Sequence, residues 1–260
     1  MTDGQAARLV GMLHLGALPG APGFAGDFEA ALEATVQDAL ALQEAGFDAL
    51  LVENYGDAPY FADEVPKVTV AAMARAVATV QAAVSLPLGV NVLRNDALAA
   101  LAVAAATGAA FIRVNVLTGA MFTDQGFLQG RAAELARARQ ALGPELEVLA
   151  DVFVKHAVPP RGFTIEQAAT DTYQRGLADG LVVTGSGTGH PPDPSLVDKV
   201  RKAVPEAPVL VGSGVSKGRV RRLLEVSDGV IVGTDLKLDG VIANPVDPKR
   251  ARAFVRAARA

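Results

Sequence analysis

Two short segments decide the fold class: Val209-Leu210-Val211-Gly212-Ser213-Gly214-Val215 and Val230-Ile231-Val232-Gly233-Thr234-Asp235. Each is an apolar run that stops at a glycine and a hydroxyl-bearing residue, and one helix-length segment separates the two. Two such strand-to-turn units in tandem, at the end of a chain of this size, are typical of a (β/α)8 barrel whose last two turns bind phosphate. Backbone N–H groups at these turns can converge on an anion. The two segments therefore predict an α/β barrel and the class of its ligand.

The length and composition of the chain fit one barrel domain. The chain has 260 residues, close to the about 250 of a typical (β/α)8 barrel. Half of the residues are apolar and a fifth are charged, which allows a large buried core. The composition does not change along the chain. We therefore expect residues 1–260 to form a single TIM barrel with parallel strands.

Eight apolar runs alternate with eight amphipathic, Ala-rich segments. The predicted strands lie near residues 8–14, 48–53, 87–92, 110–116, 147–155, 180–184, 208–212 and 229–233. The predicted helices lie near residues 28–45, 66–84, 95–107, 130–142, 165–177, 193–203, 216–224 and 248–259. The strands are continuously apolar, as expected where helices cover a parallel sheet. An open, doubly wound sheet is the alternative, but it rarely needs eight units without a second domain.

The connections at the two ends of the predicted strands differ in length and composition. Helix-to-strand connections are tight, whereas strand-to-helix connections are long and rich in Gly, Pro and polar residues. The long connections are residues 15–27, 54–65, 117–129, 156–164 and 185–192. Because barrel enzymes carry their sites on the strand-to-helix face, we expect the functional site there.

Charge and composition exclude several classes of partner. The net charge is −4 and no basic run occurs, so nucleic acid is not an expected partner. The absence of cysteine excludes disulfides and thiolate chemistry. No stretch approaches the about 18 apolar residues of a membrane span, and no export signal is evident. We therefore expect a cytoplasmic protein, and the Ala-rich outer helices predict a homo-oligomer.

Polar residues stand at the ends of strands that are otherwise apolar. The candidate site residues of this kind are His14, Glu53, Asn54, Asn91, Arg113, Asn115, Asp151, Lys155, His156, Thr184 and Ser186. In a barrel these strand ends converge over the top of the lumen, so the set can form one pocket. We assign catalysis to Asp151, Lys155, Glu53, His14 and His156, and substrate binding to the others.

Lys155 is the sharpest catalytic candidate. If burial lowers its pKa, it could form a Schiff base with a carbonyl substrate, or it could act as a fixed cation that holds an enediolate or carboxylate. Asp151 or Glu53 could be the general base, with His14 or His156 as the acid.

Simpler interpretations remain open. Arg113 and Asp151 could form a structural ion pair between neighbouring strands. His14 could plug the barrel mouth, and Asn91 could cap the next helix. A divalent metal held by Glu53, Asp151 and His14 has no spacing motif in its favour, so no cofactor is predicted.

The predicted phosphate cup has its own residues. They are Gly212, Ser213, Gly214, Gly233 and Thr234. The alternative is that these glycines only permit tight turns.

The segment Thr184-Gly185-Ser186-Gly187-Thr188-Gly189 contains a G-x-G pattern, but it follows a late strand and leads into His190-Pro191-Pro192, which excludes a dinucleotide-binding interpretation. It is either a mobile substrate loop or a plain connection.

The chain resembles the BtpA/SgcQ family nearly from end to end. The segments that carry the resemblance are Gly11–Leu15 with Leu18–Pro22, Val52–Pro59, Gly89–Asn95, Phe111–Val116 with Gly119–Met121, Ala150–Val152 with Val154–His156, Thr184–Ser186 through Gly189, Val211–Val215, Val232–Thr234 and Asn244–Pro248. Together they are specific. The resemblance implies a TIM barrel similar to ribulose-phosphate-binding barrels.

The resemblance leaves the reaction open. One branch of the family is associated with photosystem I, another with sugar-uptake genes, and fold alone is a poor guide to reaction. The favoured hypothesis is an enzyme acting on a phosphorylated sugar or related metabolite, with isomerase or lyase chemistry by proton transfer. The alternatives are a non-catalytic assembly factor of the photosystem I type and a metabolite-binding regulator.

Overall fold

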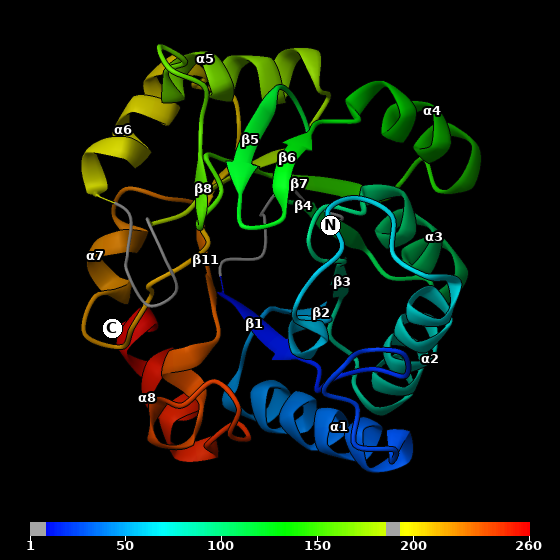
Figure 1. The fold of residues 1–260 in the computed structure, drawn as a ribbon. Helices are drawn as coiled ribbons and strands as arrows, with labels where there is room; N and C mark the ends of the chain where they lie inside the picture. The colour runs from blue at the N-terminus through cyan, green and yellow to red at the C-terminus, as the bar shows by residue number, and fades with distance from the viewer. Residues whose placement is uncertain (1–8, 186–192) are drawn as a thin grey trace.

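Within residues 9–185 and 193–260, which the computed structural model describes, eight parallel strands close into a barrel (Figure 1). The strands are β1 (Leu9–His14), β2 (Ala49–Glu53), β3 (Leu88–Asn91), β4 (Phe111–Val114), β7 (Glu147–Val152), β9 (Gly180–Val183), β10 (Val209–Val211) and β11 (Gly229–Val232). They follow one another round the barrel in chain order, and β11 pairs with β1 to close it. The predicted barrel is confirmed.

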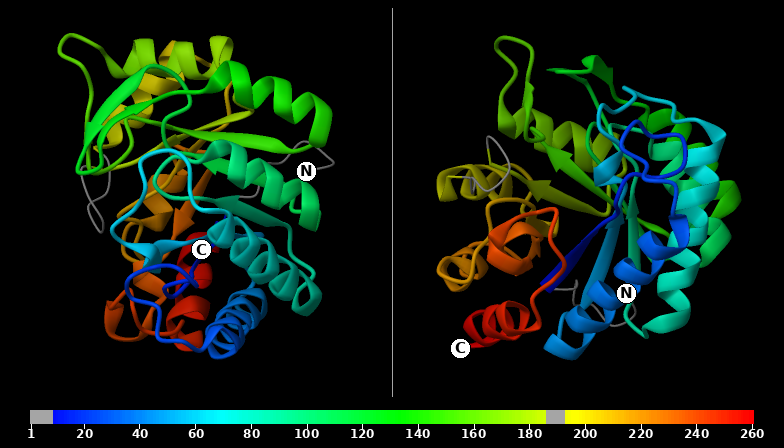
Figure 2. Two further views of the ribbon diagram at one scale, coloured as in Figure 1. Left: turned by 45° about the vertical axis from the view of Figure 1, so that its right-hand side comes forward. Right: turned by 60° about the horizontal axis from the view of Figure 1, so that its bottom comes forward.

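The helices surround the strands as an outer layer, seen end-on in Figure 1 and from two further sides in Figure 2. They are α1 (Phe28–Ala45), α2 (Lys67–Ala83), α3 (Ala97–Thr107), α4 (Ala132–Leu142), α5 (Ile165–Thr170) with a π-helical turn (Asp171–Arg175), α6 (Pro194–Ala203), α7 (Val220–Leu224) and α8 (Pro248–Arg259). Acidic N-caps fix several starts: Asp27, Asp96 and Asp247 each accept a backbone N–H of the first turn. None of the described helices is long and apolar enough to cross a membrane.

Two apolar layers hold the barrel together. The larger layer lies between the strands and the helices, and it takes in the small residues of the Ala-rich helices. The smaller layer fills the lumen with side chains from successive strands: Val10, Met12, Ala49, Leu51, Phe111, Leu149, Val182, Leu210 and Ile231. The lumen is thus a packed core, and its upper end is closed by the polar residues described below.

Two of the long connections contain strands that the sequence analysis did not predict. β5 (Ala120–Thr123), β6 (Gly126–Gln129) and β8 (Ala157–Val158) form a small antiparallel sheet outside the barrel, in the order β6-β5-β8. Residues 117–129 and 156–164 are thus long strand-to-helix connections, as expected, but they contain short strands that were not predicted. Strands of two to four residues carry too little periodicity to be recognised, and this sheet forms because its inner residues pack with Val116 and Val154.

A buried ion pair ties the C-terminal part of the chain to the first helix. The Lys237 ammonium, between the 3-10 turns Thr234–Leu236 and Leu238–Gly240, lies 2.6 Å from Oδ2 of Asp38 on α1. Oδ1 of Asp38 accepts the backbone N–H of Val246 at 2.7 Å. The two side chains are 3% and 12% exposed, so each charge depends on the other.

Replacing Lys237 by Met is expected to destabilise the fold by about 3–5 kcal/mol, because it leaves the Asp38 carboxylate buried without its partner. Urea unfolding followed by circular dichroism measures the change. The matched control is Lys202→Met, which removes an exposed pair with Asp198 on α6 and should cost about 0.5 kcal/mol or less. Equal losses in the two variants would contradict the interpretation.

Candidate functional site at the barrel mouth

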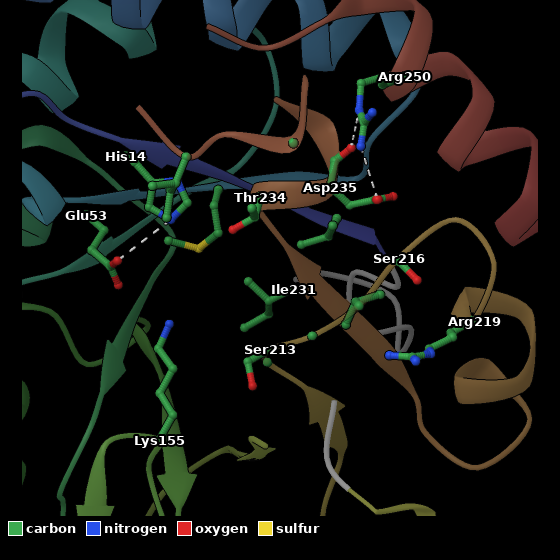
Figure 3. A pocket seen from close by; sticks show the side chains of 18 of the residues that line it. His14, Glu53, Lys155, Ser213, Ser216, Arg219, Ile231, Thr234, Asp235 and Arg250 are labelled. Atoms are coloured by element: carbon green, nitrogen blue, oxygen red, sulfur yellow. Dashed lines mark hydrogen bonds and ion pairs between the residues drawn. The ribbon is translucent and has the colours of Figure 1, made fainter. Parts of the chain in front are cut away.

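A pocket with a volume of about 190 Å³ opens at the carboxyl ends of the barrel strands (Figure 3). It brings together two groups of residues that the sequence analysis predicted. The first group is His14, Glu53, Arg113 and Lys155, and the second is Gly212, Ser213, Gly214, Gly233 and Thr234. In Figure 3, Glu53, His14 and Lys155 lie on one side of the pocket, and Ser213, Ser216 and Arg219 lie on another. The arrangement provides an anion-binding side and a side with reactive groups.

Glu53 and His14 stand next to each other at the ends of adjacent strands. Oε1 of Glu53 lies 3.9 Å from Nε2 of His14, which is too long for a hydrogen bond. Both side chains are nearly buried, with 6% and 8% of their surface exposed. Apart from this contact, the described residues give the Glu53 carboxylate no ion pair or side-chain hydrogen bond. It is therefore available to a ligand.

His14 is neutral over the whole physiological range. Burial, reinforced by the charges of Lys237, Lys155 and Arg113, lowers its pKa to about 3. Its ring packs edge-on against Tyr55, with the centroids 5.0 Å apart. Nδ1 is buried and has no hydrogen-bond partner among the described residues. His14 can thus exchange a hydrogen bond with a ligand but does not add charge to the pocket.

Arg113 and Asp151 form the ion pair that was one of the two interpretations of these residues. Nε and Nη2 of Arg113 donate to the two oxygens of Asp151 at 3.0 and 3.1 Å, and Nδ2 of Asn115 donates to Oδ2 at 2.8 Å. All three residues are buried. Arg113 reaches the pocket lining, whereas Asp151 is not among the lining residues. The carboxylate of Asp151 therefore orients Arg113, and this bidentate geometry leaves it poorly placed to act as a base.

Lys155 is held by an unusual backbone. Phe153 and His156 have φ values of 56° and 57°, a left-handed conformation that costs a residue with a Cβ roughly 1 kcal/mol. The Lys155 carbonyl accepts a 2.6 Å hydrogen bond from Nη2 of Arg94, a buried residue that the sequence analysis did not select. Burial lowers the pKa of Lys155, with Arg113 and Arg94 acting in the same direction against Glu53 and Asp151.

The anion-binding side is built from the turns after β10 and β11. Among the described residues, no acceptor is found for the backbone N–H groups of Gly214, Val215, Ser216 and Thr234, all of which line the pocket. Arg219 adds an exposed guanidinium that has no ion-pair partner within the described chain and extends toward the pocket in Figure 3. Arg219 was not predicted as a site residue, because a helix near residues 216–224 was expected to contain it. The helix starts at Val220.

Asp235 fixes the shape of these turns. Its Oδ2 accepts the Lys217 N–H at 2.8 Å, and Arg250 of α8 donates to its backbone carbonyl at 2.7 Å and to Oδ1 at 3.3 Å. Both the 212–219 turn and the start of α8 are thereby tied to the end of β11. Neither Asp235 nor Arg250 was predicted as a site residue from the sequence.

Two cup glycines have a steric role. A Cβ on Gly212 would overlap Val182 and come within 3.2 Å of Nη2 of Arg113, and a Cβ on Gly233 would lie 2.5 Å from Cε1 of His14. These glycines make room for the side chains that form the pocket floor. Gly214 differs: its φ of 64° belongs to the left-handed region, as the tight-turn interpretation expects.

The remaining predicted residues surround the pocket without lining it. Asn54 donates to Asp57 and accepts the Leu93 N–H, so it joins two loops. Asn91 donates to the Arg113 carbonyl and to Asn115 rather than capping a helix.

Thr184 donates to the Phe153 carbonyl at 3.2 Å. His156 is exposed, and Ser186 lies outside the described residues.

Because Asp151 faces Arg113, it does not combine with Glu53 and His14 into a metal site. No group of three His, Asp or Glu side chains suited to a metal occurs in the described parts of the chain.

A model of the BtpA family matches residues 5–260 of this chain. An uncharacterized protein of Thermococcus kodakarensis is 49% identical, with 99% of this chain and 97% of the relative covered. The photosystem I biogenesis protein BtpA of Synechocystis is 43% identical, with coverage of 96% and 87%. The putative sgc region protein SgcQ of Escherichia coli is 34% identical, with coverage of 97% and 94%.

Solved structures show the same fold at low identity. N-(5′-phosphoribosyl)anthranilate isomerase from Pyrococcus furiosus superposes with a TM-score of 0.60 at 14% identity, with 98% of this chain and 99% of that chain covered. Tryptophan synthase from M. tuberculosis gives 0.63 at 21% identity, with coverage of 98% and 93%. At such identities the likeness concerns the barrel alone.

The low pKa of His14 predicts a pH dependence of stability. Between its ordinary value of 6.5 and the folded value of about 3, the unfolded chain binds a proton that the folded protein does not. Stability is therefore expected to fall by up to about 1.4 kcal/mol per pH unit as the pH is lowered from 6.5 to about 5. His14→Gln should remove this part of the slope and His156→Gln should retain it, as measured by urea unfolding. An unchanged slope in His14→Gln would contradict the neutral, buried imidazole.

Proposed function

The chain belongs to the BtpA family, and we propose that it is an enzyme acting on a phosphorylated sugar or related metabolite, with isomerase or lyase chemistry by proton transfer. The observation that carries the proposal is the pairing of two chemistries in one pocket. Arg219 and backbone N–H groups that have no acceptor among the described residues lie on one side, and Glu53, His14 and Lys155 lie on the other.

The phosphate group belongs in the cup after β10 and β11. The N–H groups of Gly214, Val215 and Thr234 offer directed hydrogen bonds, and Arg219 supplies the positive charge that a phosphate dianion requires. Asp235 does not repel the anion strongly, because its oxygens are held by Lys217 and Arg250. With phosphate bound there, the rest of the ligand extends toward the centre of the pocket.

Glu53 is the proposed general base. Its carboxylate is nearly buried, carries no close hydrogen bond from the described residues and faces the pocket. A carboxylate poor in hydrogen bonds can accept a proton from carbon next to a carbonyl group. The charge then developing on the carbonyl oxygen would be stabilised by Arg113 and Lys155, and neutral His14 can donate or accept a hydrogen bond there. Asp151 acts by holding Arg113.

A second function is favoured by different observations. The Synechocystis relative is named as a photosystem I biogenesis protein. This chain also exposes Phe122, Phe127 and Val158 on the small sheet outside the barrel, each more than half exposed. A non-catalytic assembly factor would use such a surface and would tolerate changes in the pocket. A metabolite-binding regulator would keep the cup and not require Glu53.

Arg219→Gln is expected to weaken the binding of phosphorylated ligands about tenfold to a hundredfold, because one charge-assisted contact is lost. The measurement is thermal unfolding with ribulose 5-phosphate, glyceraldehyde 3-phosphate, their dephosphorylated forms and sulfate. Arg222→Gln is the matched control, since it removes the same charge from α7 outside the pocket lining. No stabilisation of the wild type by any phosphorylated compound would rule out the cup.

Glu53→Gln is expected to slow proton transfer at least about a hundredfold while ligand binding persists, because the amide cannot accept the proton. The assay is NMR detection of deuterium incorporation into ligand C–H positions in D2O, using the compounds that stabilise the wild type. Exchange at the same rate in Glu53→Gln would exclude Glu53 as the base. Binding without any exchange in the wild type would favour the regulator or the assembly factor.

A further inference from the structure

We propose that Lys155 is a nucleophile that forms a Schiff base with an aldehyde or ketone group of the phosphorylated ligand. This inference rests on the proposed function, which requires only that Lys155 be near the reacting carbonyl. It names the substrate class more narrowly: a phosphate monoester that also carries a free carbonyl group. It also separates the two roles, fixed cation and covalent catalyst, that the sequence leaves open.

The first observation is the position of the amine. Lys155 lines the pocket, and its side chain extends toward Glu53 and His14 on the side away from Arg219 (Figure 3). Its Nζ forms no ion pair or hydrogen bond with the rest of the described chain. Lys155 is partly buried, whereas the fully buried lysine, Lys237, is paired with Asp38 at 2.6 Å. A lysine placed in a pocket without a partner is typical of a group that reacts with the ligand.

The second observation is the balance of charge beneath the pocket. Within the part of the chain that the structure describes, the charged groups that act on Lys155 are two buried carboxylates, Glu53 and Asp151, and two guanidinium groups, Arg113 and Arg94. Lys155 and the two arginines are thus three cations with two carboxylates. Asp151 is bound by Arg113, so Glu53 alone remains for Arg94 and Lys155.

One of these two cations is therefore in excess. Asp124 also acts on Arg94, but it is exposed and its charge is screened by water. His14 carries no charge at neutral pH.

Of the two cations, Lys155 is the one that can lose its proton. An arginine in a protein keeps its proton, whereas a lysine loses its proton readily when it is buried among other cations. Burial, Arg113 and Arg94 lower the pKa of Lys155. A larger fraction of neutral amine is therefore present at neutral pH than on an exposed lysine, and the neutral amine is the form that attacks a carbonyl carbon.

The third observation is the rigid support of the residue. The left-handed conformations at Phe153 and His156 flank Lys155, and Arg94 holds its carbonyl oxygen. Strained backbone of this kind persists where the surrounding structure fixes it, and it concentrates at functional sites. The support fixes the start of a long side chain and so directs Nζ into the pocket.

The reaction step balances without an added reagent. Glu53 first takes a proton from the Lys155 ammonium, which leaves the amine neutral and Glu53 protonated. The amine forms a bond to the carbonyl carbon, and the proton that its nitrogen then loses passes to the carbonyl oxygen to give a carbinolamine. Protonated Glu53 then gives its proton to the hydroxyl group, which leaves as water as the C=N bond forms. The resulting iminium accepts the electron pair released when Glu53 removes an adjacent proton or when a neighbouring C–C bond breaks. Hydrolysis by water regenerates the amine.

The test is reductive trapping. The protein is incubated with glyceraldehyde 3-phosphate, dihydroxyacetone phosphate or ribulose 5-phosphate and sodium cyanoborohydride, and the adduct is located by peptide mass spectrometry. The expected result is one adduct, with the mass of the ligand less one oxygen atom, on the peptide that contains Lys155. Lys155→Arg and Lys155→Met should lack it, and the control Lys67→Arg, an exposed lysine of α2, should retain it.

The outcomes distinguish this inference from the proposed function. Stabilisation of the wild type by the phosphorylated ligands without any adduct on Lys155 would overturn the Schiff base and leave a fixed cation in an intact phosphate site. An adduct on Lys155 that forms equally with unphosphorylated glyceraldehyde would support the nucleophile and count against the cup. The mapped adduct of the wild type decides the question even if the Lys155 variants fold poorly.

Discussion

The bidentate ion pair between Arg113 and Asp151 is the interaction on which the site depends. It lies buried at the top of the barrel lumen, where neighbouring strands β4 and β7 bring the two side chains together. By binding Asp151 it removes one carboxylate from the pocket, and by orienting Arg113 it fixes a cation in the pocket floor. Glu53 and Lys155 are then the charged groups at the pocket floor that have no tight partner within the described part of the chain. The glycine at 212 leaves the space that Arg113 occupies.

Much of the fold could be predicted from the sequence, because the apolar runs and helix-capping residues of this chain fit the strands and helices of one barrel. Continuous apolar runs such as Leu50-Leu51-Val52 become buried strands, and Asp27 and Asp247 begin helices at the expected places. The small sheet was missed because its strands are stabilised by one another and by residues far along the chain. No window of sequence carries that information.

The site was predicted in part, for a related reason. Strand ends are visible in sequence, so His14, Glu53, Arg113 and Lys155 were found, and the tandem glycine turns indicated the cup. What sequence cannot supply is the partner of each polar group. It could not separate Asp151, whose oxygens accept hydrogen bonds from Arg113 and Asn115, from Glu53, whose oxygens accept no side-chain hydrogen bond within the described residues. It also could not show that Arg219, on an irregular turn before α7, faces the same pocket.

The closure of the barrel has a consequence for folding during synthesis on the ribosome. β1 pairs with β11, and Asp38 meets Lys237 across 199 residues of chain, so the first strand has no second neighbour until almost the entire polypeptide has emerged. Until then β1 presents an open hydrogen-bonding edge, and Asp38 is a carboxylate without its counter-ion. A premature stop before β11 (Gly229–Val232) would leave that edge unpaired and yield a species prone to pair with other chains. Pairing of β1 along its second edge therefore depends on synthesis of β11.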